Sequence, residues 1–226
     1  MKMWITGGAV AAVAAATAVG TMTTGPSSPA SVPPQAAAVT PAKAADVSAA
    51  ALSSYKLSLK GQYQQTTYYC VPASESMSLS TFGIKVGQAT LAKKMGTTSS
   101  KGTSGANAVS VVNGYVKSKG YKLTIEKDVA GNPTVLMNRA SYDIGVLHRA
   151  PTIGVWMEKL PWNKGKVKGT KIGHAMVVYG YDKAKGTVTV FDPWKATGGT
   201  HTISAKSLAG MLQANGGMHY ISRSLL

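Results

Sequence analysis

Three side chains far apart in the sequence have the types that a cysteine nucleophile requires. Cys70 is the only cysteine of the 226 residues, so it cannot form an internal disulfide and is either inert packing or a reactive thiol. His174 begins an apolar segment, where a histidine has no packing reason to occur, and Asp192 ends a later one. A thiol, an imidazole and a carboxylate are the nucleophile, acid/base and orienting group of nucleophilic catalysis. The sequence therefore predicts a Cys70–His174–Asp192 site.

Cys70 stands at the start of a predicted helix. Apolar residues recur at helical spacing from Cys70 to about Phe82, Pro72 occupies a tolerated first-turn position, and Gly83 ends the run. A thiol at a helix N-terminus faces unpaired backbone N–H groups and the positive end of the helix dipole. This placement lowers the pKa of the thiol toward a thiolate at neutral pH.

The oxyanion of a tetrahedral intermediate needs hydrogen-bond donors beside the nucleophile. Gln64 lies a short extended stretch before Cys70, and its side-chain amide is one candidate, with the backbone N–H of Cys70 as the other. Gln62 and Gln65 compete with Gln64 for this role.

His174 and Asp192 lie at the ends of two strands that are predicted to be neighbours. Gly173–Tyr181 and Gly186–Phe191 are rich in strand-forming residues, and the turn-like sequence Asp182–Gly186 separates them. In an antiparallel hairpin, the start of the first strand lies beside the end of the second. Asp192 is then placed to accept a hydrogen bond from the His174 ring.

The remaining pattern predicts an α+β fold in which an N-terminal helical layer packs on a C-terminal antiparallel sheet. A Thr/Ser/Gly loop is expected over Thr97–Gly105. Further helices are predicted from 106 until Gly120, over 134–149 and over 204–215, and further strands over 121–125, 151–157 and 218–222.

These residues and their order resemble the papain clan of cysteine peptidases. The resemblance is strongest to the thirty-ninth cysteine-peptidase family, the bacteriocin-processing or double-glycine peptidases, and their secreted relatives. It rests on Gln64, Cys70 at a helix start, Pro72-Ala73, Gly173-His174 and Asp192-Pro193, within Tyr63–Trp194.

The resemblance implies a papain-like fold and a role for each matching residue. Cys70 would be the nucleophile, His174 the general acid/base, Asp192 the orienting residue and Gln64 part of the oxyanion hole, with no cofactor. Members of the family usually carry glycine directly after the nucleophile, where this chain has Val71.

Three other histidines have no carboxylate or cysteine companion at motif spacing. We interpret His148, His201 and His219 as surface or core residues. Four scattered histidines and one cysteine do not make a structural zinc site, so no metal is expected.

The N-terminal part of the chain differs in composition from the rest. Residues 1–22, with a lysine followed by an uncharged run, are typical of a secretory signal, although the cleavage site is open and an uncleaved anchor is the alternative. Residues 23–54, rich in Ala, Pro and Ser, are expected to be a disordered spacer, and 55–226 a single peptidase domain. This pattern predicts a secreted, extracellular protein without membrane contact after cleavage.

The chain carries a formal net charge of +16, mostly from lysine. Dispersed lysines are a general counter-ion to polyanions, whereas base-reading proteins use arginine forks, so no specific nucleic acid is expected. The densest lysines lie between 159 and 171. They favour electrostatic association with anionic cell-wall polymers, and a solubilising surface is the alternative.

The residues together predict a monomeric, secreted cysteine peptidase that acts on a peptide or protein substrate through a thioester on Cys70. One alternative is a cell-wall peptide amidase or endopeptidase. The other is a non-catalytic wall-binding module on the same scaffold, because a fold does not by itself establish a function.

Overall fold

A computed structural model describes residues 52–224, which hold seven strands and five α-helices. The strands are β1 (Ser54–Lys56), β2 (Tyr121–Glu126), β3 (Thr152–Trp156), β4 (Gly173–Asp182), β5 (Thr187–Asp192), β6 (Gly199–Ser204) and β7 (Met218–Arg223). The helices are α1 (Cys70–Ser80), α2 (Gln88–Met95), α3 (Gly105–Val116), α4 (Pro133–Ser141) and α5 (Ala205–Ala209). None of the helices in this range is long and apolar enough to cross a membrane. The predicted signal and all but the last residues of the predicted spacer lie outside the described residues.

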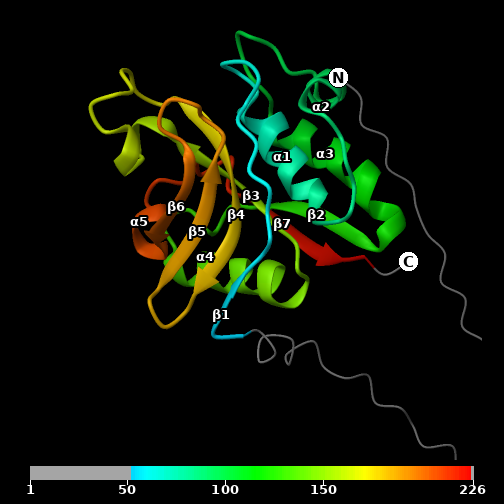
Figure 1. The fold of residues 1–226 in the computed structure, drawn as a ribbon, viewed down its shortest axis with the longest axis vertical. Helices are drawn as coiled ribbons and strands as arrows, with labels where there is room; N and C mark the ends of the chain where they lie inside the picture. Colours follow the sequence, from blue (N-terminus) through cyan, green and yellow to red (C-terminus); the bar gives the residue numbers. More distant parts are fainter. Residues whose placement is uncertain (1–51, 225–226) are drawn as a thin grey trace, which may run out of the picture. The chain divides into compact units, whose positions relative to one another are not determined.

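The strands form one antiparallel sheet in the order β2-β7-β3-β4-β5-β6 (Figure 1). One edge of β4 is shared, because β3 pairs with its first half and β1 with its last residues. Along the other edge β4 pairs with β5, as the hairpin prediction required, and Val177 lies opposite Phe191. The start of β4 therefore lies next to the end of β5.

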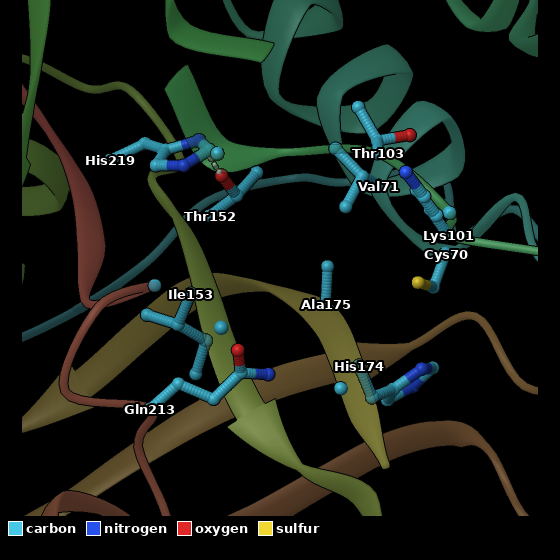
Figure 2. Close-up of a pocket in the computed structure, with 15 residues that line it drawn as sticks. Cys70, Val71, Lys101, Thr103, Thr152, Ile153, His174, Ala175, Gln213 and His219 are labelled. Atoms are coloured by element: carbon cyan, nitrogen blue, oxygen red, sulfur yellow. Dashed lines mark hydrogen bonds between the residues drawn. The ribbon is translucent and has the colours of Figure 1, made fainter. Parts of the chain in front are cut away.

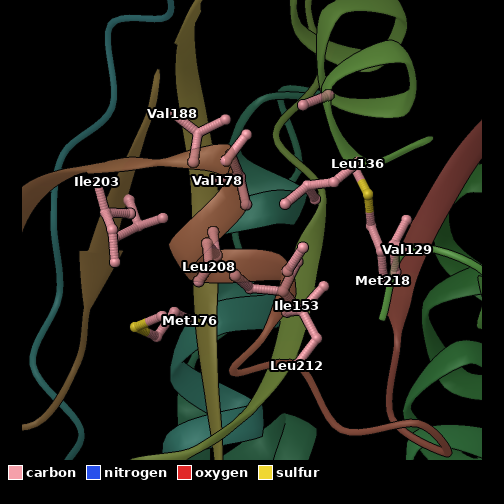
Figure 3. Close-up of a cluster of buried hydrophobic side chains, with 14 of the residues drawn as sticks. Val129, Leu136, Ile153, Met176, Val178, Val188, Ile203, Leu208, Leu212 and Met218 are labelled. Carbon is pink, nitrogen blue, oxygen red and sulfur yellow. The ribbon is translucent and has the colours of Figure 1, made fainter. Parts of the chain in front are cut away.

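The two faces of β4 pack against different helices. Val177 and Tyr179 belong to a buried cluster with Met77 of α1. Met176 and Val178, which alternate with them, belong to the cluster that α4 and α5 close on the opposite face (Figure 3). The predicted α+β class, with α1–α3 as a helical layer against an antiparallel sheet, is confirmed, and α4 and α5 add cover on the second face.

Helix α1 is enclosed on nearly all sides, and this fixes the position of its first residue. Residues 72–79 of α1 are all buried, between the sheet on one side and α2 and α3 on the other. The side chains of Met77 and Leu79 are fully buried, and each such burial stabilises the fold by roughly 1.5–3 kcal/mol. The predicted helix from Cys70 is thus present and rigidly seated.

The predicted helix over 134–149 is wrong in its last part. Helix α4 ends at Ser141, and a single π-helical turn, Tyr142–Val146, follows. In that turn the buried carboxylate of Asp143 accepts a hydrogen bond from the Ile221 N–H of β7, so tertiary contacts replace regular helical geometry. The chain then leaves the helix at His148, which has a positive φ of 55°.

The predicted helix over 204–215 is also too long, because α5 ends at Ala209. Beyond α5 the chain turns across β3, where the Gln213 N–H donates to the carbonyl of Gly154 at 2.9 Å. Helix α2 and strands β1 and β6 were not predicted. Strand β6 is held by its full-length pairing with β5, which the short segment does not reveal by itself.

Candidate active site

The chain before α1 is tied to the strand that ends in Asp192. The Gln64 N–H donates to the carbonyl of Pro193 at 2.8 Å, directly after β5. Cys70 follows as the first residue of α1, half-buried, and Tyr69 provides no side-chain cap. The thiol is therefore held at an uncapped helix start next to the β4–β5 hairpin, where first-turn N–H groups lack helical acceptors.

The structure brings His174 and Asp192 into a direct hydrogen bond. The register that pairs Val177 with Phe191 continues to place Asp192 opposite Met176, two residues from His174 on the same face of β4. His174 Nε2 lies 2.7 Å from Asp192 Oδ1, and both side chains are buried. Because Nε2 faces the carboxylate, the other ring nitrogen remains for the thiol.

Cys70 and His174 act on each other as a thiolate and an imidazolium do (Figure 2). Burial opposes ionisation of the thiol, yet the hydrogen bond and the charge of His174, with backbone hydrogen bonds from Ala175 and Val71, hold the pKa of Cys70 below 9.0. Burial lowers the pKa of His174, but Asp192 and Cys70 raise it from 6.5 to about 9. Each group therefore favours the charged form of the other.

Asp192 stays ionised although it is buried. Burial raises the pKa of its carboxyl, but the hydrogen bond and charge of His174 outweigh this and lower it. The Trp194 N–H donates to Oδ1 and the Trp162 Nε1–H to Oδ2, each at 2.8 Å. Every partner of this carboxylate among the described residues is thus a donor, which suits a group that holds one orientation of the imidazole.

Trp162 is a site residue that sequence reasoning missed. It comes from the loop after β3, and its ring stacks on His201 of β6 with centroids 3.8 Å apart and planes 1° apart. The stack orients its Nε1–H toward Asp192. A tryptophan in a lysine-rich loop gives no sequence signal of this contact, because the loop reaches the site only through tertiary packing.

Gln64 is buried close to the site but does not line the cavities that hold Cys70. Its Nε2 donates to the carbonyl of Thr66 at 2.7 Å, and it lines a neighbouring hollow with Trp194. Of its two predicted competitors, Gln62 contacts Ser76 through Oε1, and Gln65 is exposed. The oxyanion role of Gln64 stays a prediction.

Two connected hollows open at Cys70 and His174. The first, about 210 Å³, extends over α1 and β3 and includes Val71. The second, about 710 Å³, extends toward the lysine-rich loop and includes Lys166 and Trp194. Val71 thus lines a hollow that it shares with the thiol.

The three other histidines have different surroundings. His148 is exposed beside Tyr55, and His201 is stacked on Trp162. His219 is buried, as a core residue would be, and its Nδ1 lies 2.6 Å from Oε1 of Glu75, 144 residues away, a contact that motif spacing cannot reveal. Among residues 52–224, His, Cys, Asp and Glu do not gather in groups of three or more that could hold a metal.

Two of three comparisons with known proteins found matches. The model of the Peptidase_C39 like family matches residues 56–216. A search of curated proteins found no match.

Three solved structures share the fold. They are the peptidase domain of Streptococcus ComA, a bifunctional ABC transporter of a quorum-sensing pathway (20% identity, 76% of this chain and 99% of that chain, TM-score 0.50); a double-glycine-motif protease from an AMS/PCAT transporter in complex with the leader peptide (16%, 75% and 94%, 0.50); and a C39-like peptidase from Bacillus anthracis (17%, 78% and 98%, 0.51).

Proposed function

The chain belongs to the Peptidase_C39-like family of papain-clan cysteine peptidases, as its motifs predicted, and we propose that it hydrolyses peptide bonds through a thioester on Cys70. One observation carries the proposal. The half-buried thiol at the start of α1 shares a cavity with an imidazole whose pKa is raised to about 9 by a buried carboxylate and by the thiol itself. This combination activates a sulfur nucleophile without any further group.

Acylation uses the proton that His174 already holds. The Cys70 thiolate attacks the carbonyl carbon, an S–C bond forms, and the C=O electron pair moves onto oxygen. The His174 imidazolium then gives its proton to the leaving nitrogen as the C–N bond breaks, which leaves a thioester and a free amine. Asp192 keeps Nε2 of the ring toward itself, so that Nδ1 serves the reacting groups.

Hydrolysis of the thioester runs the same proton path in reverse. Neutral His174 takes a proton from water, the hydroxide attacks the thioester carbon, and the sulfur leaves as thiolate beside the re-formed imidazolium. The Cys70 N–H, in the first turn of α1, is one donor to the oxyanion. Gln64 is proposed as the second, through the Nε2 hydrogen that Thr66 does not take.

A peptide is the proposed substrate class. The AMS/PCAT protease that shares this fold was solved in complex with a leader peptide, which supports a peptide in the same position here. The uncharged run that follows Lys2 supports export, so we propose that the enzyme acts outside the cell. We also propose that it is a monomer.

A second candidate is hydrolysis of peptides attached to anionic wall polymers. Five lysines of the loop between β3 and β4 are exposed, and one of them, Lys166, lines the larger hollow beside Cys70. The others are Lys159, Lys164, Lys168 and Lys171. Positive charge at the rim of a cleft raises the local concentration of a polyanionic substrate and makes its capture sensitive to salt.

The test is hydrolysis of a proteome-derived peptide library by residues 52–226 with added reductant, with new N-termini identified by mass spectrometry. We expect cleavage that the small epoxide inhibitor of papain-like enzymes abolishes and that Cys70→Ala and His174→Ala lack. For the second candidate, the enzyme is added to a suspension of purified wall sacculi, and a loss of turbidity would support it. Normal salt-sensitive wall binding by Cys70→Ala, without hydrolysis of any substrate by the wild type, would instead support a binding module.

A further inference from the structure

A second histidine–carboxylate pair borders the smaller hollow, away from the thiol. His219 of β7 lies at the far end of this hollow from Cys70 and His174 (Figure 2). Its Nδ1 lies 2.6 Å from Oε1 of Glu75, and the Thr152 hydroxyl donates to the same oxygen at 2.7 Å. The three side chains come from α1, β3 and β7, and all are at least nine-tenths buried. The proposed peptidase mechanism does not use this pair.

The contacts of His219 fix which of its ring nitrogens faces the hollow. Nδ1 lies 2.6 Å from Glu75 Oε1 and 2.9 Å from Thr152 Oγ1, so Nε2 is the nitrogen left for the hollow. Nε2 carries a hydrogen when Glu75 is ionised beside an imidazolium or when a protonated Oε1 donates to Nδ1, and it is bare when a neutral ring donates from Nδ1. A proton on Oε2 instead would be left without an acceptor, because that atom has no hydrogen-bond partner.

Nε2 of His219 therefore lies at the wall of the hollow, where a hydrogen on it makes the ring a donor. A Cβ added to Gly105, the first residue of α3, would lie 3.4 Å from Nε2, and Gly105 lines the hollow as well. The missing side chain at Gly105 leaves room in front of the ring. A ligand atom in that room meets a hydrogen-bond donor backed by a buried carboxylate.

The other groups around this hollow also suit an acceptor with negative charge. Lys101 lies at its rim beside Cys70, and none of the described residues that line it is acidic. Gln213 uses its Nε2 on the carbonyl of Val155, which anchors the opposite wall. Apolar surface from Val71 and Ile153 can cover the methylene groups of a side chain whose end reaches His219.

From this arrangement we propose that the hollow is a substrate subsite in which His219 Nε2–H binds the carboxylate of an acidic side chain. The proposal rests on the proposed function, because it assigns the subsite to the peptide whose bond is cleaved at Cys70. His219 touches the substrate, whereas Glu75 is a positioning residue that fixes the tautomer and orientation of the ring. The same site disfavours lysine and arginine side chains, since it offers them donors and no acceptor carboxylate.

The test measures binding and needs no hydrolysis. Cys70→Ala protein labelled with ¹⁵N at histidine is titrated with capped, glycine-rich hexapeptides that carry Glu, Gln or Lys at each position in turn. We expect a pyrrole-type, protonated Nε2 on His219 that shifts on binding. At one position the Glu peptide should bind about fivefold more tightly than the Gln peptide, because hydrogen bonds to charged groups are the stronger ones.

Three variants in this background locate the effect. Gly105→Ala places a methyl group in front of Nε2 and leaves the His219 and Glu75 side chains unchanged, so it should abolish the Glu preference, whereas Gly114→Ala, at an exposed position of the same helix, should keep it. Glu75→Gln should weaken the preference and change the ring's tautomer signal.

Equal binding of Glu and Gln peptides at every position, or a bare Nε2, would overturn the proposal. A Glu preference that survives Gly105→Ala would do the same. Because binding is read on a protein without its thiol, failure of the peptidase proposal is seen separately.

Discussion

Replacement of Asp192 by asparagine tests the whole site in one step. The carboxylate accepts from three donors: His174 Nε2–H and the Trp194 N–H on Oδ1, and the Trp162 Nε1–H on Oδ2. An asparagine keeps the shape but must turn an NH₂ group toward one side. If the NH₂ faces His174, the ring can only carry its proton on Nδ1, which then cannot accept the proton of the thiol.

The magnitude follows from the pKa of His174. Burial lowers this pKa, yet Asp192 and Cys70 raise it from 6.5 to about 9. At about 1.4 kcal/mol per pKa unit, the imidazolium is favoured by about 3.5 kcal/mol over that of an ordinary histidine, or roughly 300-fold. Asp192 is one of two partners, so Asp192→Asn should remove between about 1 and 3 kcal/mol of this preference. With its cationic partner weakened, the Cys70 thiol should titrate at higher pH than in the wild type.

The assay is the rate of Cys70 alkylation by iodoacetamide between pH 4 and 9, since only the thiolate reacts. The midpoint of the wild-type reaction should lie below pH 9.0, the ordinary pKa of the thiol, and the midpoint for Asp192→Asn should lie at higher pH than that of the wild type. Asp182→Asn is the matched control, because Asp182 lies at the far end of β4 and pairs only with Lys185 at the surface. An unchanged profile for Asp192→Asn, in a protein that melts as the wild type does, would refute the reasoning.

Two further changes probe how Asp192 is held. Trp162→Phe removes the Nε1–H that Oδ2 accepts together with part of the ring that stacks on His201, so the free energy of unfolding in urea should fall by about 1–3 kcal/mol; no change would mean that these contacts do not hold Asp192. In Gly198→Ala the new Cβ would lie 2.3 Å from the carbonyl oxygen of Asp192 and 2.2 Å from that of Trp194, so the backbone must shift. We expect a lower melting temperature and slower Cys70 alkylation, whereas Gly114→Ala, with nothing within 4 Å, should be stabilising by about 0.5–1 kcal/mol; native alkylation in Gly198→Ala would contradict the geometry.

The parts of the fold that the sequence predicts are those that local rules decide. Helix α1 follows from apolar spacing, an early proline and a terminal glycine, and the β4–β5 hairpin follows from two β-rich runs around a short turn. Each half of the candidate site lies on one of these elements. Cys70 and the His174–Asp192 hydrogen bond could therefore be placed before the tertiary structure was known.

The missed features all depend on contacts between distant segments. The π-helical turn after α4 exists because buried Asp143 bonds to β7, and α5 ends early because the following chain crosses β3. Trp162 reaches Asp192 only because its ring stacks on His201. No period, cap or motif in the sequence records such contacts, and the contact of His219 with Glu75 is hidden for the same reason.

The two histidine–carboxylate pairs show why the position of the cysteine decides the chemistry. His174 gives Nε2 to Asp192 and turns Nδ1 to the thiol, whereas His219 gives Nδ1 to Glu75 and turns Nε2 to the hollow. Each ring is fixed by a buried carboxylate, but only His174 has a nucleophile within reach. A ring that faces sulfur can exchange a proton during a reaction. In the proposed subsite the ring that faces the hollow donates a hydrogen bond from Nε2, so one pair serves catalysis at one end of the cavity and the other pair serves recognition at the opposite end.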